Sequence, residues 1–246
     1  MLISIITPLY NAEKFIASTI ESVLAQSYQK WEMIIVDDNS SDTSVDIVDK
    51  YIKNDDRIKY IKLNKQHGPG RARNIAIEKA KGQYIAFLDA DDLWMPHKLE
   101  TQLDFMQINN LAFTYSSYGL IDEYGNDIGT FHTKETISYD SMLKTCSVGC
   151  LTAIYDVNKL GKIYMPEMFK GEDYAAWLGI IKTIKTTQGI LEPLAYYRIL
   201  GTSASSNKVK ALKAQWYIYR KIEKLNIFKS IYYVVHYAYN GFLKYR

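Results

Sequence analysis

The stretch Tyr84-Ile85-Ala86-Phe87-Leu88-Asp89-Ala90-Asp91-Asp92 joins five apolar or aromatic residues directly to a group of three acids. Its apolar half predicts a strand that is buried on both faces of a sheet. A strand at the centre of a sheet cannot hold unpaired charges in its interior, so the acids should emerge at its carboxyl end. In an open α/β sheet that end is where ligands bind. The acids therefore form either an ordinary solvated turn or a site for Mg²⁺ or Mn²⁺ with a bound phosphate.

Strands and helices alternate through the first half of the chain. Strands are predicted at residues 2–7, 31–36 and 57–63, and helices at residues 15–24, directly after Ser41 and Asp42, and at residues 71–81. We expect Asn11 to cap the first helix, Ser41 or Asp42 to cap the second, and Gly82 to end the third in the left-handed conformation. This alternation predicts a mostly parallel sheet with helices on both faces.

The second half of the sequence is less regular. Pro96 predicts the start of a helix over residues 98–110, and strands are expected at residues 112–118, 151–155 and 190–198, the last of them interrupted by Pro193. Residues 122–126 are typical of a hairpin turn. A largely buried helix is predicted at residues 174–181, after the acidic pair Glu172-Asp173.

The composition of the 246-residue chain, 48% hydrophobic, indicates a folded globular protein. The first eight residues lack the basic segment of a signal peptide, and no apolar run approaches the roughly 20 residues of a spanning helix. We therefore expect a cytoplasmic protein. Cys146 and Cys150 have no histidine cluster beside them and are expected to be reduced, partly buried thiols.

The net charge of +3 conceals two different regions. Residues 207–246 carry nine bases and one acid, Glu223, a net charge of +8, which leaves residues 1–206 at −5. We therefore expect an α/β domain over residues 1–206 and a basic, aromatic helical tail over residues 207–246. The tail either packs as a helical pair with a solvated basic face or associates with an anionic membrane surface. Nucleic acid is not expected as a partner because the acidic body would repel it.

Acidic residues fall into three groups: Asp37 and Asp38, then Asp89, Asp91 and Asp92, then Glu172 and Asp173. The first two groups follow predicted parallel strands and should share one edge of the sheet. The third begins a helix, where carboxylates are also favoured simply as helix caps. Arg71 and Arg73 lie at the amino end of their helix, the unfavourable end for a cation, which indicates either a phosphate site or an ordinary solvated helix face.

Five motifs in order resemble those of the family 2 glycosyltransferases. They are Ser4-Ile5-Ile6-Thr7-Pro8-Leu9-Tyr10-Asn11, Ile35-Val36-Asp37-Asp38-Asn39-Ser40-Ser41-Asp42, Gly70-Arg71-Ala72-Arg73-Asn74, residues 82–92 and Gly171-Glu172-Asp173. Each motif alone is weak, but their order is specific and covers about the first 200 residues. The resemblance implies an inverting enzyme of bacterial surface-polysaccharide synthesis with the GT-A fold, a mixed, mostly parallel sheet flanked by helices.

The resemblance also implies ligands and residue roles. The donor would be a nucleotide-diphospho-sugar, usually a UDP-sugar, with Mn²⁺ or Mg²⁺, and the acceptor a glycan or lipid-linked oligosaccharide at the inner face of the cell membrane. Pro8 and Tyr10 fall where the family packs the base, Asp38 where it bonds the uracil or ribose, and Arg73 with Arg71 near the diphosphate. Asp91 with Asp89 falls on the metal, and Asp173 on the catalytic base, which leaves Glu172 to bond backbone N–H groups or orient the acceptor.

One residue departs from the family pattern, because Leu200 stands where a histidine often occurs and cannot ligate a metal. The main alternative is a nucleotide-sugar-binding protein without turnover. A phosphatase with an Asp-x-Asp motif is disfavoured because the first predicted strand ends in Pro8 without an acid. A nucleotidyltransferase is disfavoured because no glycine-rich loop follows that strand.

Overall fold

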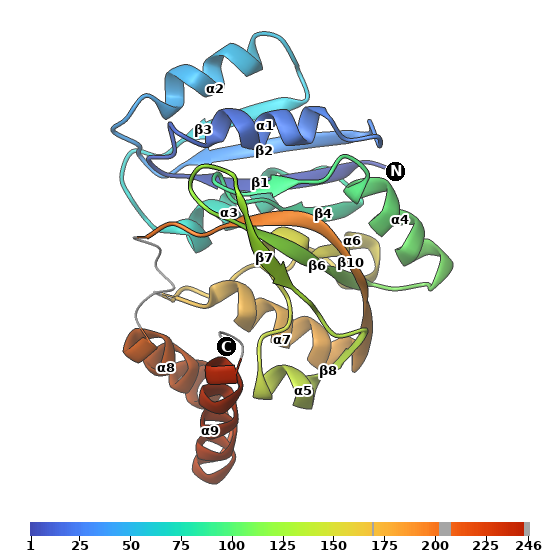
Figure 1. Cartoon of the computed structure of the whole chain (residues 1–246), viewed down its shortest axis with the longest axis vertical. Helices are drawn as coiled ribbons and strands as arrows, with labels where there is room; N and C mark the ends of the chain where they lie inside the picture. Colours follow the sequence, from blue (N-terminus) through green and yellow to red (C-terminus); the bar gives the residue numbers. More distant parts are fainter. Residues whose placement is uncertain (169, 202–207, 244–246) are drawn as a thin grey trace.

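The structure of the protein, a computed structural model, describes residues 1–168, 170–201 and 208–243. Strands in this part of the chain form one mixed sheet with the order β3-β2-β1-β4-β9-β6-β10-β5 (Figure 1). Its first four strands are parallel: β3 (Ile58–Lys62), β2 (Trp31–Asp37), β1 (Ile3–Leu9) and β4 (Tyr84–Phe87). They are connected through α1 (Ile16–Leu24), α2 (Ser44–Ile52) and α3 (Pro69–Lys79). The predicted alternation of strands and helices is confirmed.

The second half of the chain extends the sheet through longer-range pairings. β9 (Ile154–Asp156) runs antiparallel between β4 and β6 (Phe113–Ile121), and β10 (Thr186–Arg198) lies parallel to β6. The register of β10 shifts on both sides of Pro193, as the sequence predicts. Three short strands complete the sheet: β5 (Leu93–Trp94) and β8 (Thr136–Ser138) on β10, and β7 (Asp127–Phe131) on β6.

Helices cover both faces of the sheet, because side chains of each parallel strand alternate between two apolar clusters. Ile5 and Ile35 pack in the cluster with α1, α2 and α4 (Lys98–Ile108). Ile6 and Ile34 pack in the other cluster with α3 and α7 (Glu172–Ile184). Short helices α5 (Tyr139–Lys144), η1 (Cys150–Thr152) and α6 (Val157–Leu160) complete the layers. Each buried isoleucine contributes about 1.5–3 kcal/mol to the free energy of unfolding. The packing on both faces therefore holds the ends of the parallel strands in place.

The C-terminal helices pack beneath α5 and α7 (Figure 1). They are α8 (Lys208–Tyr217), a π-helical turn η3 (Ile218–Ile222) and α9 (Ile227–Leu243). Ile218 and Tyr219 are buried in the same cluster as Trp177 of α7. In the described part of the chain no helix is long and apolar enough to cross a membrane. The expected domain boundary between residues 206 and 207 lies outside the described residues.

Two expectations about glycine and asparagine are wrong. Gly82 does not end α3 in the left-handed conformation, since α3 ends at Lys79 and Gly82 has no positive φ. It is glycine for lack of space: a Cβ there would lie 2.6 Å from the Ser4 backbone nitrogen. Asn11 does not cap α1, which begins five residues later; its Oδ1 accepts a hydrogen bond from the Ser41 N–H instead (2.9 Å).

The expected cap of the second helix is corrected in detail. α2 starts at Ser44 after Thr43, whose side chain makes no capping bond. Ser41 is not the cap. Asp42 contributes from one residue further out, because its Oδ1 accepts from the Ser44 N–H (3.0 Å) while Oδ2 accepts from the Glu13 N–H (3.0 Å). Asp42 therefore ties α2 to the segment before α1.

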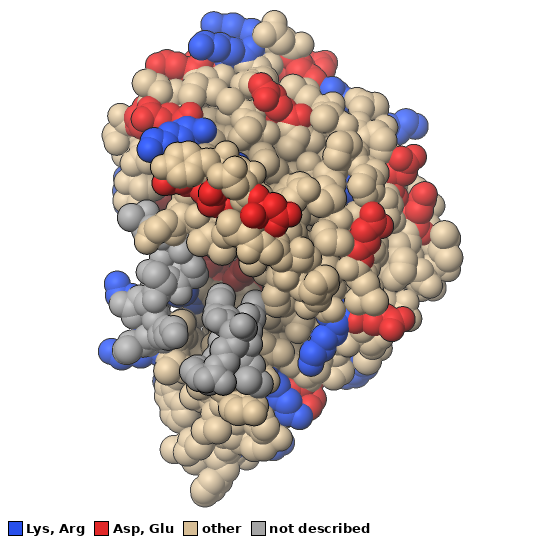
Figure 2. Space-filling view, in the orientation of Figure 1, with Lys and Arg blue, Asp and Glu red and all other residues tan. Residues whose placement is uncertain are grey.

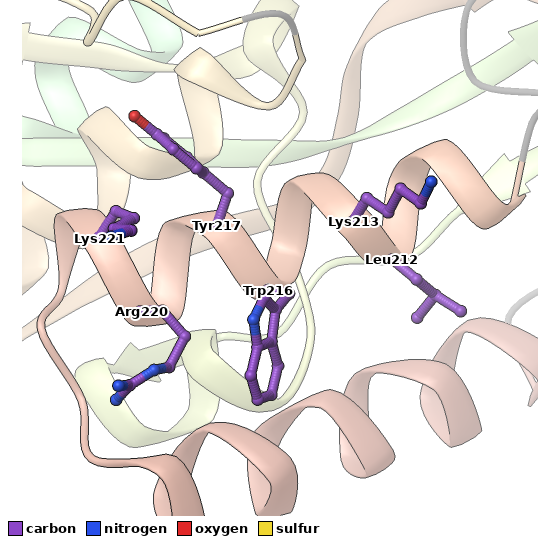
Figure 3. Close-up of a pocket in the computed structure, with 6 residues that line it drawn as sticks. All are labelled: Leu212, Lys213, Trp216, Tyr217, Arg220 and Lys221. Atoms are coloured by element: carbon purple, nitrogen blue, oxygen red, sulfur yellow. The ribbon is translucent and has the colours of Figure 1, made fainter.

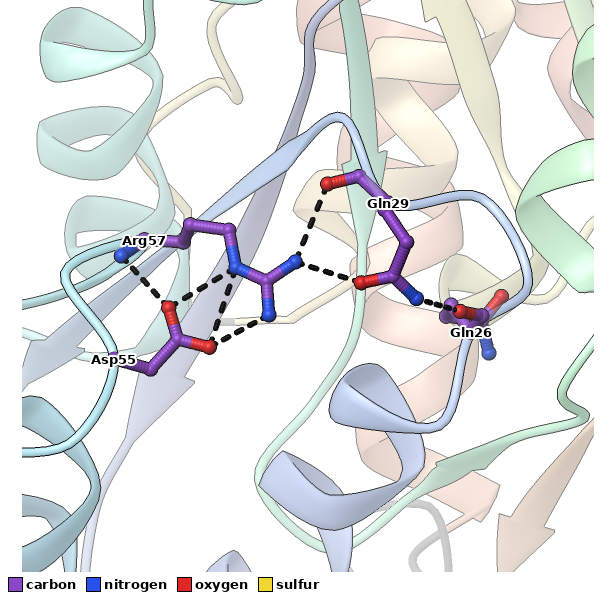
Figure 4. A network of polar contacts seen from close by, with 4 residues as sticks. All are labelled: Gln26, Gln29, Asp55 and Arg57. Atoms are coloured by element: carbon purple, nitrogen blue, oxygen red, sulfur yellow. Dashed lines mark hydrogen bonds and ion pairs between the residues drawn. The ribbon is translucent and has the colours of Figure 1, made fainter.

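A polar network closes the opposite end of the sheet, before β2 and β3 (Figure 4). Arg57 donates to both oxygens of Asp55 and, through Nη1, to Oε1 of Gln29 (2.9 Å). Gln29 in turn donates to the backbone carbonyl of Gln26. The Arg57 guanidinium also lies 3.8 Å from the ring centroid of Trp31. Each of its three side-chain nitrogens donates within the protein, so this end of the sheet is structural.

Candidate active site

Arg73 lies at the centre of the acidic edge of the sheet and joins three elements. It is a buried residue of α3, and its Nη2 donates to Oδ1 of Asp89, directly after β4 (2.6 Å). Its Nη1 donates to Oε1 of Glu172, the first residue of α7 (3.0 Å). Burial by itself would lower the pKa of Arg73, but the charges of Asp89 and Glu172 outweigh it and hold that pKa well above its ordinary value.

Two glycines allow α3 and α7 to approach each other at this point. Gly70 lies in the first turn of α3, where a Cβ would be 3.0 Å from Cγ of Glu172. Gly171 precedes α7 in the left-handed conformation (φ +81°), which L side chains rarely adopt. The sequence motifs around Arg71 and Asp173 thus meet in space because both contain a glycine at the contact.

The Asp89–Asp92 turn is supported from the other side by Arg198, at the end of β10. Arg198 is buried; its Nε donates to the backbone carbonyl of Asp91 (2.8 Å), and its own N–H donates to Oδ1 of Asp92 (2.9 Å). Its Nη1 donates to the carbonyls of Asp122 (3.1 Å) and Glu123 (3.3 Å). Asp92 is therefore fixed to β10.

Charge accumulates in this turn. Burial and then the charge of Asp89 raise the pKa of Asp91 to about 6. Burial and the charges of Asp91 and Asp89 raise the pKa of Asp92 well above its usual range. Asp89 is neutralised by Arg73, whereas no ion pair is present at Asp91 among the described residues. Asp91 thus differs from Asp89, which is paired with Arg73, and from Asp92, which accepts from the Arg198 N–H.

Asp173 follows Glu172 in α7 and is half-buried. Burial and the adjacent charge of Glu172 raise its pKa to about 6, against the opposing effect of Arg73. A carboxylate with this pKa is ionised at neutral pH and is still basic enough to accept a proton from a reacting hydroxyl. The two neighbouring carboxylates therefore lie in different surroundings. Arg73 binds Glu172, and burial raises the pKa of Asp173.

The residues expected to bind the nucleotide lie along the same edge. Pro8, the last residue but one of β1, is partly exposed, and Tyr10 lies directly after the strand with an exposed ring. Asp38 is buried, and its two oxygens accept from the N–H groups of His67 and Gly68 (2.7 Å each). Asp38 thus shapes the loop that begins α3. The neighbouring Asp37 is structural, since it accepts from Ser40 and from the Tyr60 hydroxyl (2.8 Å).

A cavity of about 450 Å³ opens at the amino end of α3. His67, Gly68, Pro69 and Gly70 line one side, and Met165, Pro166 and Glu167 the other. Arg71 reaches across it to Oε1 of Glu167 (3.1 Å), and both side chains are exposed. An exposed pair of this kind contributes little to stability, so Arg71 is free to exchange Glu167 for a bound anion.

The implied Mn²⁺ or Mg²⁺ fits these residues in part. No group of three or more metal-ligating side chains occurs within the described ranges. Asp91, half-buried next to Asp89 and without an ion pair among the described residues, has the hard oxygen ligands that both ions prefer. Leu200 is partly buried and offers no ligand atom. An ion here would therefore depend on Asp91 and on oxygens of the donor and water.

Comparisons with known proteins agree with this geometry. Residues 4–152 match the family described as glycosyl transferase family 2. The chain belongs to this family. It is similar to the putative teichuronic acid biosynthesis glycosyltransferase TuaG of Bacillus subtilis, 45% identical over 99% of this chain and 97% of that protein. The predicted glycosyltransferase activity and the GT-A fold are thereby confirmed.

A second relative and a solved structure add detail. The UDP-Glc:alpha-D-GlcNAc-diphosphoundecaprenol beta-1,3-glucosyltransferase WfgD of Escherichia coli is 39% identical over 99% of this chain and 94% of its own length. The structure of S. aureus TarS 1–349 in complex with UDP-GlcNAc superposes with a TM-score of 0.70 at 24% identity, over 90% of this chain and 67% of that chain. The latter likeness supports the fold of this glycosyltransferase.

Two residues of the site were not singled out from the sequence. Arg198 was expected only as the last residue of a predicted strand, and nothing in a local pattern reveals that its partners are backbone carbonyls. Cys150, in η1, lies close enough to Arg73, Asp89 and Asp173 for their charges to act on it, and burial raises the pKa of its thiol well above the ordinary value. Neither Cys150 nor Cys146 forms a disulfide, as expected.

Proposed function

We propose that this glycosyltransferase transfers a sugar from a UDP-sugar to a hydroxyl of a lipid-linked acceptor, with inversion at the anomeric carbon. The observation that carries the proposal is the half-buried Asp173, with its pKa near 6, beside the Arg73–Asp89–Glu172 cluster. The UDP-sugar and the diphospholipid acceptor are supported by the name of the 39% identical WfgD, which matches almost the whole chain.

The reaction is a single displacement at the anomeric carbon. The acceptor hydroxyl attacks this carbon from the face opposite UDP and passes its proton to Asp173. The bond between the anomeric carbon and the diphosphate oxygen breaks, and its electron pair leaves with UDP. Arg71, at the amino end of α3, would attract the diphosphate, while Pro8, Tyr10 and the loop held by Asp38 would receive the nucleoside. Retention would require a carboxylate nucleophile, for which the described residues offer no separate candidate.

Divalent metal dependence is part of the proposal. Asp91 would be the protein ligand for Mn²⁺ or Mg²⁺, with Asp89 adjacent but already bound to Arg73. When bound, such an ion neutralises negative charge that develops on the departing diphosphate. Arg73 would then act mainly by fixing Asp89 and Glu172, since its own donors are used by these two carboxylates.

With a lipid-linked acceptor, the reaction would take place at the inner surface of the cell membrane, as a step in the synthesis of a surface polysaccharide. The assay would combine the full-length protein, UDP-glucose, Mn²⁺ and a GlcNAc-diphospholipid, with release of UDP and the product's anomeric configuration by NMR as readouts. A β-linked product from the α-linked donor supports the proposal. Binding of UDP-sugars without release of UDP, for a panel of acceptors, would instead identify a nucleotide-sugar-binding protein without turnover.

A further inference from the structure

The outer face of α9 carries a continuous apolar stripe. Phe228, Val235 and Tyr239 are 81%, 62% and 61% exposed, and Ile231 and Tyr232 between them are about half exposed. These positions recur every three or four residues and therefore share one side of the helix. Single exposed apolar residues are ordinary on a protein surface, but a stripe over about three turns is not.

Exposed bases lie beside this stripe, and the exposed acid next to it, Asp140 of α5, is paired with Lys144 (2.6 Å). Lys221, Lys224 and Lys229 are exposed at the start of α9 and in the turn before it. The one acid of the C-terminal helices, Glu223, is buried and accepts from Lys182 (2.9 Å) and from the Tyr139 hydroxyl (2.5 Å). Exposed acid is therefore absent from the described part of α8, η3 and α9, and the molecular tip that α9 forms shows no charge on the face seen in Figure 2.

α8 adds an amphipathic rim. Leu212, Lys213, Trp216, Tyr217, Arg220 and Lys221 surround a shallow depression there (Figure 3). Trp216 and Arg220 point toward α9, and Arg220 donates to the backbone carbonyl of Leu225 in the turn between the helices. Exposed tryptophan, tyrosine and lysine next to an apolar stripe is the composition that suits a membrane–water interface.

We propose that the outer face of α9, with the exposed bases beside it, docks on the surface of an anionic lipid bilayer. This inference deepens the proposed function and rests on it for the lipid-linked acceptor. The helix would lie on the membrane, with Phe228, Ile231 and Val235 below the headgroups and Lys221, Lys224 and Lys229 among lipid phosphates. A second copy of the chain fits less well, because two such faces would bring their lysines together.

The docking face is joined to the site through η3. Ile218 lies against Gly171: a Cβ on that glycine would be 3.3 Å from the Ile218 Cδ1. Tyr219 donates to the carbonyl of Leu143, and Tyr233 of α9 donates to Oδ1 of Asp140 (2.8 Å), both in α5. Membrane contact through α9 would therefore hold Asp173 at a fixed height above the lipid, on the side where the sugar of a diphospholipid acceptor lies.

Point variants of the full chain test the surface without removing the buried Ile218 and Tyr219. The test variant is Phe228→Ser/Ile231→Ser/Val235→Ser, and the matched control is Ile108→Ser/Tyr124→Ser, two residues 82% exposed on the body. Vesicles contain phosphatidylcholine and phosphatidylglycerol at 7:3, or phosphatidylcholine alone. We expect the wild type and the control to float with the anionic vesicles, and the vesicle-bound fraction of the test variant to fall by about tenfold.

A charge variant, Lys221→Gln/Lys224→Gln/Lys229→Gln, should lose most of the difference between the two vesicle types. Equal flotation of wild type and test variant would overturn the inference. The inference would also be overturned if ultracentrifugation showed the wild type to be a dimer and the test variant to be a monomer. UDP affinity and transfer to a water-soluble acceptor should stay unchanged in the test variant, while transfer to a lipid-linked acceptor in vesicles falls. Flotation is measured without donor or acceptor sugar. A failure of the proposed reaction would therefore not change the measured vesicle binding.

Discussion

At the residue scale, Arg73 is the side chain whose replacement should lower the free energy of unfolding most. Its replacement by lysine keeps one charge but cannot bridge Asp89 and Glu172 at once, since the two bonds use different guanidinium nitrogens. Breaking a buried pair of this kind costs about 3–5 kcal/mol of unfolding free energy, measured by urea denaturation. Arg71→Lys is the control, because its pair with Glu167 is exposed and its loss should change stability by less than about 0.5 kcal/mol. Equal effects of the two variants would contradict the central role of Arg73.

The proposed base gives a rate and a pH prediction. Asp173→Asn should lower kcat by about 10²–10⁴ and leave UDP binding nearly unchanged, because the amide cannot accept the proton. Glu172→Gln should cost less in kcat. Wild-type kcat should rise with pH through about 6, where Asp173 loses its proton, and level off above it. A wild-type pH profile that is flat between 5 and 8 would place the base elsewhere.

The residues of the site could be predicted from sequence much better than their contacts. The motifs named Asp38, Arg73, Asp89, Asp91 and the Glu172-Asp173 pair, and all of these lie along one edge of the sheet. Their partners could not be predicted, since Arg73 binds a residue 99 positions away and Arg198 binds main-chain oxygens. Gly82 shows the same limit: helix-end chemistry suggested a left-handed glycine, but the cause is the nearby backbone of Ser4.

At the scale of elements, the approach of α3 to α7 can be tested by one methyl group. In a helix interior, replacement of glycine by alanine ordinarily stabilises by about 0.5–1 kcal/mol. Gly179 of α7 has open space around its Cβ position, so Gly179→Ala should show this gain in thermal unfolding. Gly70→Ala should instead lose stability and kcat together, because its Cβ would press on Glu172 at 3.0 Å. If both variants were more stable than the wild type, the contact between α3 and α7 would be able to accommodate the extra methyl group.

Local periodicity predicts the long elements and misses the short ones. The helices α1 to α3 and the strands β1 to β4 were expected near their observed bounds, because each carries its own apolar repeat. β5 and β8 have only two or three residues, and β9, expected at residues 151–155, is the three residues Ile154–Asp156 that follow η1; all three owe their conformation to partners far along the chain. Their pairing with β10, β4 and β6 is a tertiary effect that no window of sequence contains.

At the scale of the whole molecule, the acidic turn should weaken the fold that holds it. The pKa of Asp91 is near 6 in the folded protein and about 3.9 in an unfolded chain. The folded state therefore binds more protons between these values, and the free energy of unfolding should fall as pH rises from about 4 to about 6 and stay low above it. Asp91→Asn removes this repulsion, so at pH 7 its melting temperature without metal should exceed that of the wild type by about 2–4 °C.

The same variant should lose the effect of metal. Mn²⁺ with UDP should raise the melting temperature of the wild type more at pH 7 than at pH 5, because a proton competes for Asp91 at the lower pH. For Asp91→Asn this increase should be small at both values. Asp104→Asn, which changes a carboxylate of α4 outside the acidic turn, serves as the control for the loss of one charge. An Asp91→Asn protein that binds UDP with Mn²⁺ as the wild type does would exclude Asp91 as the ligand.

The contact between Ile218 and Gly171 also orders events during translation. The ribosome synthesises the chain from its N-terminus, so the segment from β1 to α3 can fold before α8 and α9 have been synthesised. Until η3 emerges, Gly171 lacks its contact with Ile218, and the apolar cluster that contains Trp177 lacks Ile218 and Tyr219. The turn of Asp173 should therefore stay incomplete until η3 and α9 pack, and these C-terminal segments should complete both the site and the surface that we propose brings the enzyme to its acceptor.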